Sequence, residues 1–118
     1  MDISIQIDNQ WVVVKLNGSL VASTCEELKG QMTKLMGRNY LHFILDMEQV
    51  EFMDSSGLGS CIALNRESAG KGGKIVCCNL KDNVRKIFQM TRADQKVSVV
   101  GDAMEASKLV MDHIIQKK

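Results

Sequence analysis

Residues 51–60 read Glu51-Phe52-Met53-Asp54-Ser55-Ser56-Gly57-Leu58-Gly59-Ser60. An apolar stretch, Leu41–Met47, precedes this segment, and a second apolar stretch follows its glycines. This order predicts a strand, an acidic turn that carries two adjacent hydroxyls, and a helix that begins near Ser56. The hydroxyl of Ser55 is placed to cap that helix by accepting a hydrogen bond from a free amide of the first turn.

A serine on such a turn is also accessible to another protein. A phosphate on Ser55 would add about −1.5 to −2 charges beside the positive end of the helix dipole. That change is large enough to switch a binding surface. We therefore interpret Ser55 first as a switch and second as a helix cap.

The N-terminal residues predict an antiparallel hairpin. Ile3, Ile5 and Ile7 alternate with polar residues, which indicates a strand with one buried face. A turn at residues 8–10 leads into a second strand at 11–16. We expect the first strand to lie at or near one edge of the sheet.

From residue 11 onward, strand patterns alternate with helix patterns. Further strands are expected at 41–47, 74–80 and 97–100, and helices are expected to begin at Thr24, near Ser56, near Asn83 and after Asp102. The first helix is predicted from the capping-box pattern Thr24-Cys25-Glu26-Glu27. The fold class is therefore α/β: one domain, residues 1–118, with a mixed, mostly parallel sheet of about five strands and about four helices.

Composition limits the classes of partner. The chain has 118 residues, of which 45% are hydrophobic, enough for a single core. A formal net charge of +1 gives no reason to expect nucleic acid or an anionic membrane as a partner. The first residues lack a signal-peptide pattern, and no apolar run approaches the ~18 residues of a membrane span. We expect a cytoplasmic protein.

The four cysteines do not follow a metal-binding or redox pattern. No Cys-x-x-Cys or Cys/His ligand spacing occurs. Cys77 and Cys78 are neighbours in a predicted strand, so their side chains should point to opposite faces. Together with Cys25 and Cys61 they are predicted to be buried thiols. We expect neither a metal nor another cofactor.

Three further features could be mistaken for catalytic sites. The turn Gly70–Lys74 lacks the P-loop spacing and leads into a strand, which favours a helix C-terminal turn. His42 and His113 have no partner close in sequence for acid–base or metal chemistry. The Gly-x-Ser-x-Gly elbow is absent around Ser55. We expect no catalytic residues and no enzymatic activity.

Charged residues are segregated along the chain. The approach to Ser55 is acidic, with four carboxylates and no basic residue: Asp46, Glu48, Glu51 and Asp54. Alone this is a solvated turn, but beside a phosphorylated serine it would steer the basic groove of a kinase. The third-helix region is basic and is interpreted as a solvated face: Lys81, Arg85, Lys86 and Arg92.

Phe52–Gly59 resembles the STAS domain of bacterial anti-sigma factor antagonists, in which Phe-Met-Asp-Ser-Ser-Gly-Leu-Gly follows the third strand. Three other segments fall where that family has equivalents: Leu16–Leu20, Gly70–Lys74 and Val84–Met90. The resemblance thus covers nearly the whole chain. One departure is Val21, because the family commonly has an acidic residue in this strand-to-helix loop, which borders the partner surface. The identity of the partner is therefore left open.

The resemblance implies partner switching. In the family the serine directly after the Asp is phosphorylated, and this serine corresponds to Ser55. The unmodified protein would bind an anti-sigma factor that is also an ATP-using serine kinase, and so release the sigma factor. That kinase would inactivate it by phosphorylating Ser55, and a serine phosphatase would restore it.

The expected contact with the partner centres on the start of the second helix, where Gly57 and Gly59 would leave the backbone open to close approach. The contact residues expected there are Asp54, Ser55, Ser56, Gly57 and Leu58. The loop from Ser19 to Thr24, including Ser23, is expected to lie beside them.

Two other classes of function remain open. One is a STAS switch or scaffold with a non-sigma output, such as a stress-signalling assembly, secretion or biofilm control. The other is a small-molecule binder or enzyme that uses the crevice near the strand ends. Phosphorylation by the cognate kinase would separate a binding switch from an enzyme.

Overall fold

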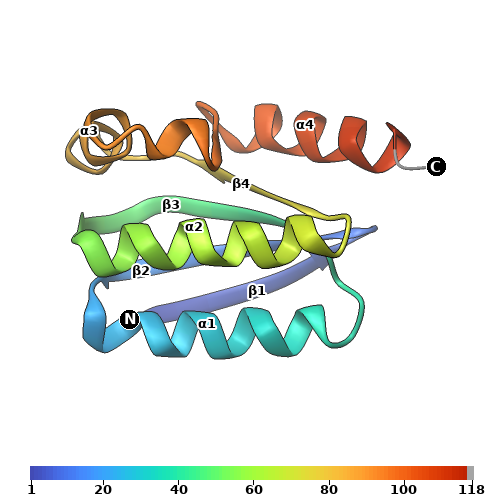
Figure 1. Ribbon diagram of the computed structural model, residues 1–118, viewed down its shortest axis with the longest axis horizontal. Coiled ribbons are helices and arrows are strands. Elements are labelled where there is room, and N and C mark those ends of the chain that lie inside the picture. The colour runs from blue at the N-terminus through green and yellow to red at the C-terminus, as the bar shows by residue number, and fades with distance from the viewer. Residues whose placement is uncertain (117–118) are drawn as a thin grey trace.

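The computed structural model describes residues 1–116 (Figure 1). In chain order the elements are β1 (Asp2–Asp8), β2 (Trp11–Leu20), α1 (Ala22–Met36), β3 (His42–Met53), α2 (Ser55–Gly70), β4 (Lys74–Cys78), α3 (Asp82–Met90), the 3-10 turn η1 (Ala93–Gln95), β5 (Ser98–Val99) and α4 (Ala103–Gln116). The strands form one 5-stranded sheet in the order β1-β2-β3-β4-β5. β1 pairs antiparallel with β2, and all other neighbouring strands are parallel. The predicted α/β architecture is confirmed.

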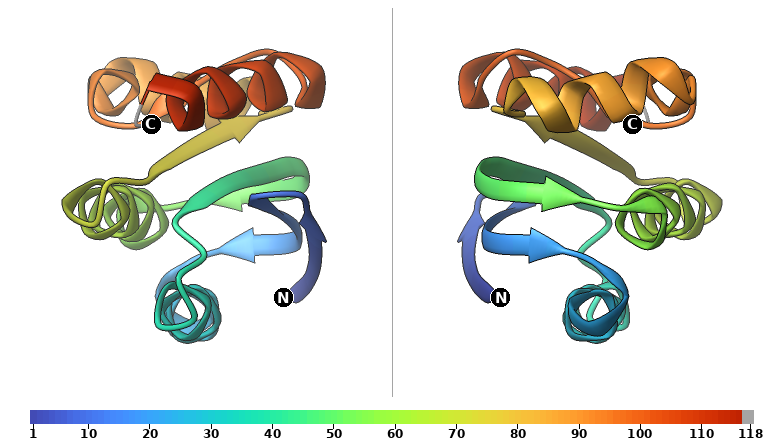
Figure 2. Two further views of the ribbon diagram at one scale, coloured as in Figure 1. Left: turned by 90° about the vertical axis from the view of Figure 1, so that its right-hand side faces the viewer. Right: turned by 90° about the vertical axis from the view of Figure 1, so that its left-hand side faces the viewer.

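Helices pack on both faces of the sheet (Figures 1 and 2). The main core lies between the sheet and α1, α2 and α3, and includes Leu28, Leu64 and Phe88 from those helices. A smaller second core lies on the opposite face, where α4 packs over β3 and β4. Its buried members are Trp11, Ile44, Val76, Cys78, Ala106 and Val110. β4 is thus covered on both sides, which explains why its residues from Ile75 to Cys78 are all buried.

β3 is longer than the sequence pattern indicated. The predicted strand ends at Met47, whereas pairing with β2 continues as far as Met53. The register shifts twice along this pairing, between Lys15 and Asn17 and between Gly18 and Ser19. These irregularities break the alternation of buried and exposed residues, which is why periodicity alone underestimated the strand. The extension brings β3 directly to Asp54.

The prediction that β1 buries its isoleucine face is wrong for two of three residues. Ile3 packs against the main core, but Ile5 is 37% exposed and Ile7 is 51% exposed. All three lie on the core side, because they pair with buried β2 residues. The helices of that face pack over β2, β3 and β4, so most of the edge strand β1 extends beyond their cover.

Candidate functional site

Asp54 caps α2. Its Oδ1 accepts hydrogen bonds from the backbone N–H of Ser56 at 2.9 Å and of Gly57 at 3.1 Å. Ser55 is therefore the first residue of the helix, and the prediction that its hydroxyl is the cap is wrong. The carboxylate one residue earlier reaches the same free amides. The Ser55 side chain is exposed and makes no hydrogen bond to the described part of the chain.

Gly57 joins the start of α2 to the end of β2. A Cβ atom there would overlap the carbonyl oxygen of Leu20 and lie 2.9 Å from Cγ of Met53. The backbone N–H of Asp54 donates to the same Leu20 oxygen at 3.3 Å. The close approach predicted for Gly57 is thus made within the chain itself. Gly59 is exposed, and nothing lies within 4 Å of the position its Cβ would take, so it does leave the helix surface open.

The start of α1 is built differently. Val21 occupies the N-cap position and has no side-chain acceptor, and no acidic residue lies in the first turn. Thr24 is the third helical residue, so the prediction that a capping box begins there is wrong. Its hydroxyl accepts the N–H of Val21 at 3.0 Å and donates to the carbonyl of Ser19 at 2.7 Å. Ser19 lies in β2 and Ser23 is exposed in the first turn of α1.

The two helix starts border one groove of about 320 Å³. Its walls are Ala22, Cys25, Glu26 and Lys29 from α1, and Ser55, Ser56, Gly59 and Ser60 from α2. Ala22, within the predicted Ser19–Thr24 segment, does lie beside Ser55 and Ser56, whereas Cys25, Glu26 and Lys29 were not predicted as part of this surface. Helical spacing indicates which face of a helix is buried, but it does not indicate which helix lies beside which.

Not every predicted contact residue offers its side chain to a partner. Leu58 is only 7% exposed and belongs to the main core, and Gly57 is buried. Leu58 and Gly57 instead hold the start of α2, which carries Ser55, against the rest of the domain. Phe52, at the end of β3, is 49% exposed and was not predicted as a surface residue. Phe52 thus adds an exposed aromatic side chain to the surface, two residues before the capping residue Asp54.

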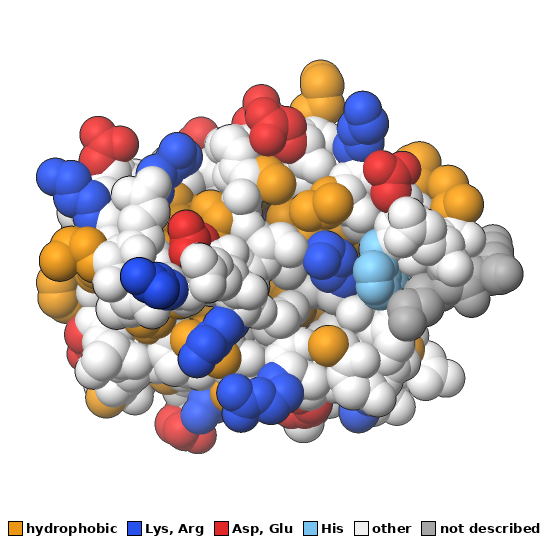
Figure 3. All heavy atoms as spheres, turned by 45° about the horizontal axis from the view of Figure 1, so that its top comes forward, with side chains coloured by type: hydrophobic (Ala, Val, Ile, Leu, Met, Phe, Trp, Pro, Cys, Tyr) orange, Lys and Arg blue, Asp and Glu red, His pale blue; other side chains and the backbone are white. Residues whose placement is uncertain are grey.

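The acidic residues before Ser55 do not form a free negative strip. Glu51 pairs with Lys81 through a 3.2 Å contact between Oε1 and Nζ. Oδ1 of Asp46 accepts the backbone N–H of Glu48 and the side-chain amide of Asn79. Asp54 is the cap. Figure 3 faces α3 and α4 and shows basic and acidic side chains interspersed. The Glu51–Lys81 pair joins the acidic segment to the basic one.

All four cysteines are buried and free, as predicted. Cys77 belongs to the main core and Cys78 to the second core, on opposite faces of β4. Burial, followed by the charge of Asp46, raises the pKa of the Cys78 thiol to about 12. A hydrogen bond with Cys61 and complete burial hold the pKa of Cys77 well above its usual range. These two thiols are protonated and unreactive at neutral pH.

The two histidines meet although they are far apart in sequence. Nε2 of His42, at the start of β3, lies 3.0 Å from Nδ1 of His113 on α4. Burial and the nearby charge of His113 lower the pKa of His42. The pair ties α4 to the sheet, a contact that the local sequence could not reveal. Among residues 1–116 there is no group of three or more His, Cys, Asp or Glu side chains that could hold a metal ion.

None of the helices in residues 1–116 combines the length and the apolar character needed to cross a membrane. The longest, α2, carries a polar N-terminal turn.

The part of the chain that contains β2, β3 and α2 also matches a known protein family. The family model of the STAS domain matches residues 2–106, which contain the whole sheet and the groove. The chain belongs to the STAS domain family. The resemblance drawn from Phe52–Gly59 is therefore confirmed, and the STAS domain here comprises the sheet, α1 to α3 and the start of α4.

Individual relatives support the same placement. The anti-sigma F factor antagonist of Paenibacillus polymyxa is 30% identical over 81 residues, 68% of this chain and 69% of the relative. A Thermotoga maritima protein assigned as an anti-sigma factor antagonist superposes with a TM-score of 0.87 at 20% identity, over 92% of this chain and 94% of that one. The Bacillus cell fate determinant SpoIIAA in its phosphorylated form gives 0.72 at 23% identity, over 92% and 99%. At such identities the two solved structures show the shared fold.

Proposed function

We propose that this STAS domain is an anti-sigma factor antagonist switched by phosphorylation of Ser55. Unphosphorylated, it binds an anti-sigma factor that is also a serine kinase, and the sigma factor is released. The observation that carries this proposal is the geometry of Ser55, an exposed and unbonded hydroxyl on the first helical residue after a capping Asp54. The relative named as an anti-sigma F factor antagonist and the structural neighbour known in a phosphorylated form support it. A protein with this role works in the cytoplasm.

The phosphoryl transfer requires the kinase to supply the catalytic groups. Oγ of Ser55 attacks the γ-phosphorus of ATP, the bond to the β–γ bridging oxygen breaks, and ADP leaves. The hydroxyl proton passes to a base of the kinase. Asp54 serves as the helix cap, with its Oδ1 accepting two backbone N–H bonds. This domain contributes the acceptor hydroxyl and the docking surface.

The product is compatible with the fold. A phosphate on Ser55 lies at the N-terminus of α2, where the helix dipole favours negative charge by about 0.3–1 kcal/mol at an exposed site. It would stand in the groove between Glu26, which repels it, and Lys29, which attracts it. Neither helix start needs to unwind to accept it, since the Ser55 hydroxyl takes part in no internal hydrogen bond.

Loss of partner binding follows from local charge. A phosphate dianion buried in an interface without a compensating cation costs several kcal/mol, roughly 3–5 when a buried charge is left unpaired. The partner that fits the unmodified surface has no such cation in place, so binding is lost without refolding of this domain. A serine phosphatase that hydrolyses the phosphoserine restores binding.

The test begins with the cognate kinase and ATP. Wild type should gain one phosphate by mass spectrometry, and Ser55→Ala should gain none while still binding the kinase. Ser56→Ala is the matched control, because Ser56 is the exposed neighbouring hydroxyl, and it should still be phosphorylated. Phosphate on Ser56 in the Ser55→Ala protein would show that the wrong hydroxyl had been chosen.

A second experiment addresses release of the partner. Ser55→Asp should weaken kinase binding at least tenfold, about 1.4 kcal/mol. Its circular dichroism spectrum should match that of the wild type, because the effect is local. Weakened binding together with a large spectral change would point instead to rearrangement of the domain. A titration that also contains the sigma factor then asks whether binding releases it, which separates sigma control from another output.

A further inference from the structure

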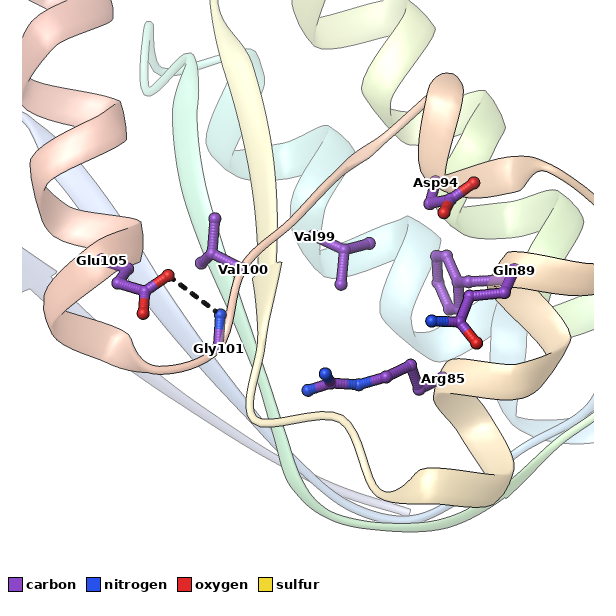
Figure 4. A pocket seen from close by; sticks show the side chains of 8 residues that line it. Arg85, Gln89, Asp94, Val99, Val100, Gly101 and Glu105 are labelled. Atoms are coloured by element: carbon purple, nitrogen blue, oxygen red, sulfur yellow. Dashed lines mark hydrogen bonds between the residues drawn. The ribbon is translucent and has the colours of Figure 1, made fainter.

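A second hollow, of about 360 Å³, lies along the edge strand β5. It is bounded by α3 and η1 on one side and by the start of α4 on the other (Figure 4). The chain diverges here, because α3 packs on the main-core face whereas α4 packs on the opposite face. In open α/β sheets, ligands bind in crevices where connections leave neighbouring parallel strands toward opposite faces. The hollow does not include Ser55 or any other wall of the groove.

Among residues 1–116, Arg85 is the one cation that lines this hollow. Its side chain extends from α3 toward Gly101 (Figure 4). Nε is buried and has no hydrogen-bond partner, and the guanidinium forms no ion pair within residues 1–116. A buried donor left without a partner costs about 1–3 kcal/mol. A ligand carboxylate in the hollow would pair with the terminal Nη groups of Arg85, which are not among the buried atoms, because the planar guanidinium matches the two oxygens of that group.

Two carboxylates line the hollow as well. Oε2 of Glu105 accepts the backbone N–H of Gly101 at 3.3 Å, which fixes this side chain at the start of α4. Asp94 on η1 makes no hydrogen bond or ion pair with the described residues. With one positive and two negative groups, the lining would repel a simple anion and would leave Arg85 unpaired around a simple cation. Only a molecule with both charges complements it.

Apolar side chains form part of the remaining lining. Phe88, Val99 and Val100 contribute to the wall, with the side-chain amide of Gln89 at its margin. A volume of about 360 Å³ lies at the small end of the roughly 300–1,000 Å³ range of ligand pockets. It admits a molecule with a short apolar side chain beside its charged groups.

We propose that this hollow binds a small zwitterion of the free amino acid class. The ligand carboxylate pairs with Arg85, its ammonium group lies between Asp94 and Glu105, and its side chain contacts Val99 and Val100. The STAS domain thus has a small-molecule binding site that is separate from the phosphoryl acceptor Ser55. It does not depend on the proposed function, because none of its residues belongs to the groove.

NMR titration of ¹⁵N-labelled protein tests the proposal directly. The probes are glycine, alanine, valine and leucine, with acetate and methylamine as molecules that carry only one of the two charges. An amino acid should shift the Arg85 Nε–H signal and the backbone amides of Val100 and Gly101. Acetate and methylamine should bind at least tenfold more weakly. An acetate affinity equal to that of the best amino acid would overturn the zwitterion assignment in favour of a plain anion site.

Variants identify the residues responsible. Arg85→Gln should weaken amino acid binding at least tenfold, whereas Lys86→Gln, an exposed cation on the same helix, should leave it unchanged. Asp94→Asn should weaken binding of the amino acid but not of acetate, and it remains informative if Arg85→Gln does not fold. Absence of shifts with every probe, or equal binding by wild type, Arg85→Gln and Asp94→Asn, would overturn the proposal.

Discussion

The helices α1 and α2 border one groove but begin in opposite ways. α2 starts with the Asp54 carboxylate, which accepts two backbone N–H bonds. Gly57 has no side chain, so the first turn of α2 lies directly against the carbonyl of Leu20. α1 starts at Val21, which accepts no hydrogen bond with its side chain, and the Thr24 hydroxyl is the side-chain group that accepts the N–H of Val21. Ser55, the serine proposed as the switch, thus lies on α2, the helix whose start has a side-chain cap and a close backbone contact. The start of α1, where Val21 offers no side-chain acceptor, is the helix start that a substitution can stabilise.

The largest expected effect is at Gly57. Gly57→Ala places a Cβ onto the Leu20 carbonyl, so the start of α2 must move away from β2. Overpacking of this kind costs about 1–3 kcal/mol, and we expect the upper end because the obstructing atom belongs to the backbone. Urea denaturation measures the change.

Gly59→Ala is the matched control for Gly57→Ala. Nothing lies near its added methyl group, and replacing glycine by alanine in a helix favours stability by about 0.8–1 kcal/mol. Similar losses at both positions would mean that α2 is not held against β2 as described.

Removal of the α2 cap comes next. Asp54→Ala leaves the amides of Ser56 and Gly57 without their acceptor and should cost about 0.5–2 kcal/mol. Asp54→Asn keeps an acceptor oxygen and should cost a few tenths, roughly within the 0.5 kcal/mol usual for benign changes. Thermal unfolding of both variants separates loss of the hydrogen bonds from loss of charge. If Asn were as harmful as Ala, the carboxylate charge would be the stabilising feature.

The reverse change at α1 should stabilise the domain. Val21→Asp supplies the missing side-chain acceptor and a negative charge at the helix N-terminus, a gain of about 0.5–1 kcal/mol. It also restores an acidic residue of the kind common in the family at this position. A midpoint in urea equal to that of the wild type would show that Thr24 already satisfies this turn.

The smallest effect is expected at the switch itself. The Ser55 hydroxyl is not the cap and makes no hydrogen bond within the described chain, so Ser55→Ala should change stability by less than about 0.5 kcal/mol. Ser60→Ala is the contrasting variant, because that buried hydroxyl donates to the Ser56 carbonyl at 2.9 Å. Calorimetry should therefore rank Ser60→Ala as the more damaging of the two.

Local patterns predicted most of the fold because most of its elements are specified locally. Strand and helix periods gave the sheet, the hairpin and the α4 cap at Asp102, whose Oδ1 accepts the N–H of Glu105 at 2.9 Å. The same reasoning found the turn before α2 but chose the wrong side chain as its cap. Asp54 and Ser55 are adjacent, both cap helices well, and the sequence alone does not decide which residue has extended backbone angles.

The remaining features depend on tertiary contacts. Val21 ranks poorly as an N-cap, so the α1 start could not be read from its own residues. The exposed faces of Ile5 and Ile7 follow from which strands the helices cover. Arg85 in the sequence is one charge in a basic helix, and its buried, unpaired Nε became visible only once β5 and α4 were placed beside α3.

The division of the interior into two cores sets a hierarchy of hydrogen exchange. α4 is attached through the smaller core and the His42–His113 contact, so its amides can exchange through an opening that leaves the main core intact. The pKa of His42 is lowered in the folded domain, so proton uptake favours the detached helix as the pH falls below the usual value of about 6.5. Amides in the middle of β2 and β3 should exchange only on global unfolding. α4 can therefore detach and dock again while the main core, which holds α2 and Ser55 in place, stays folded.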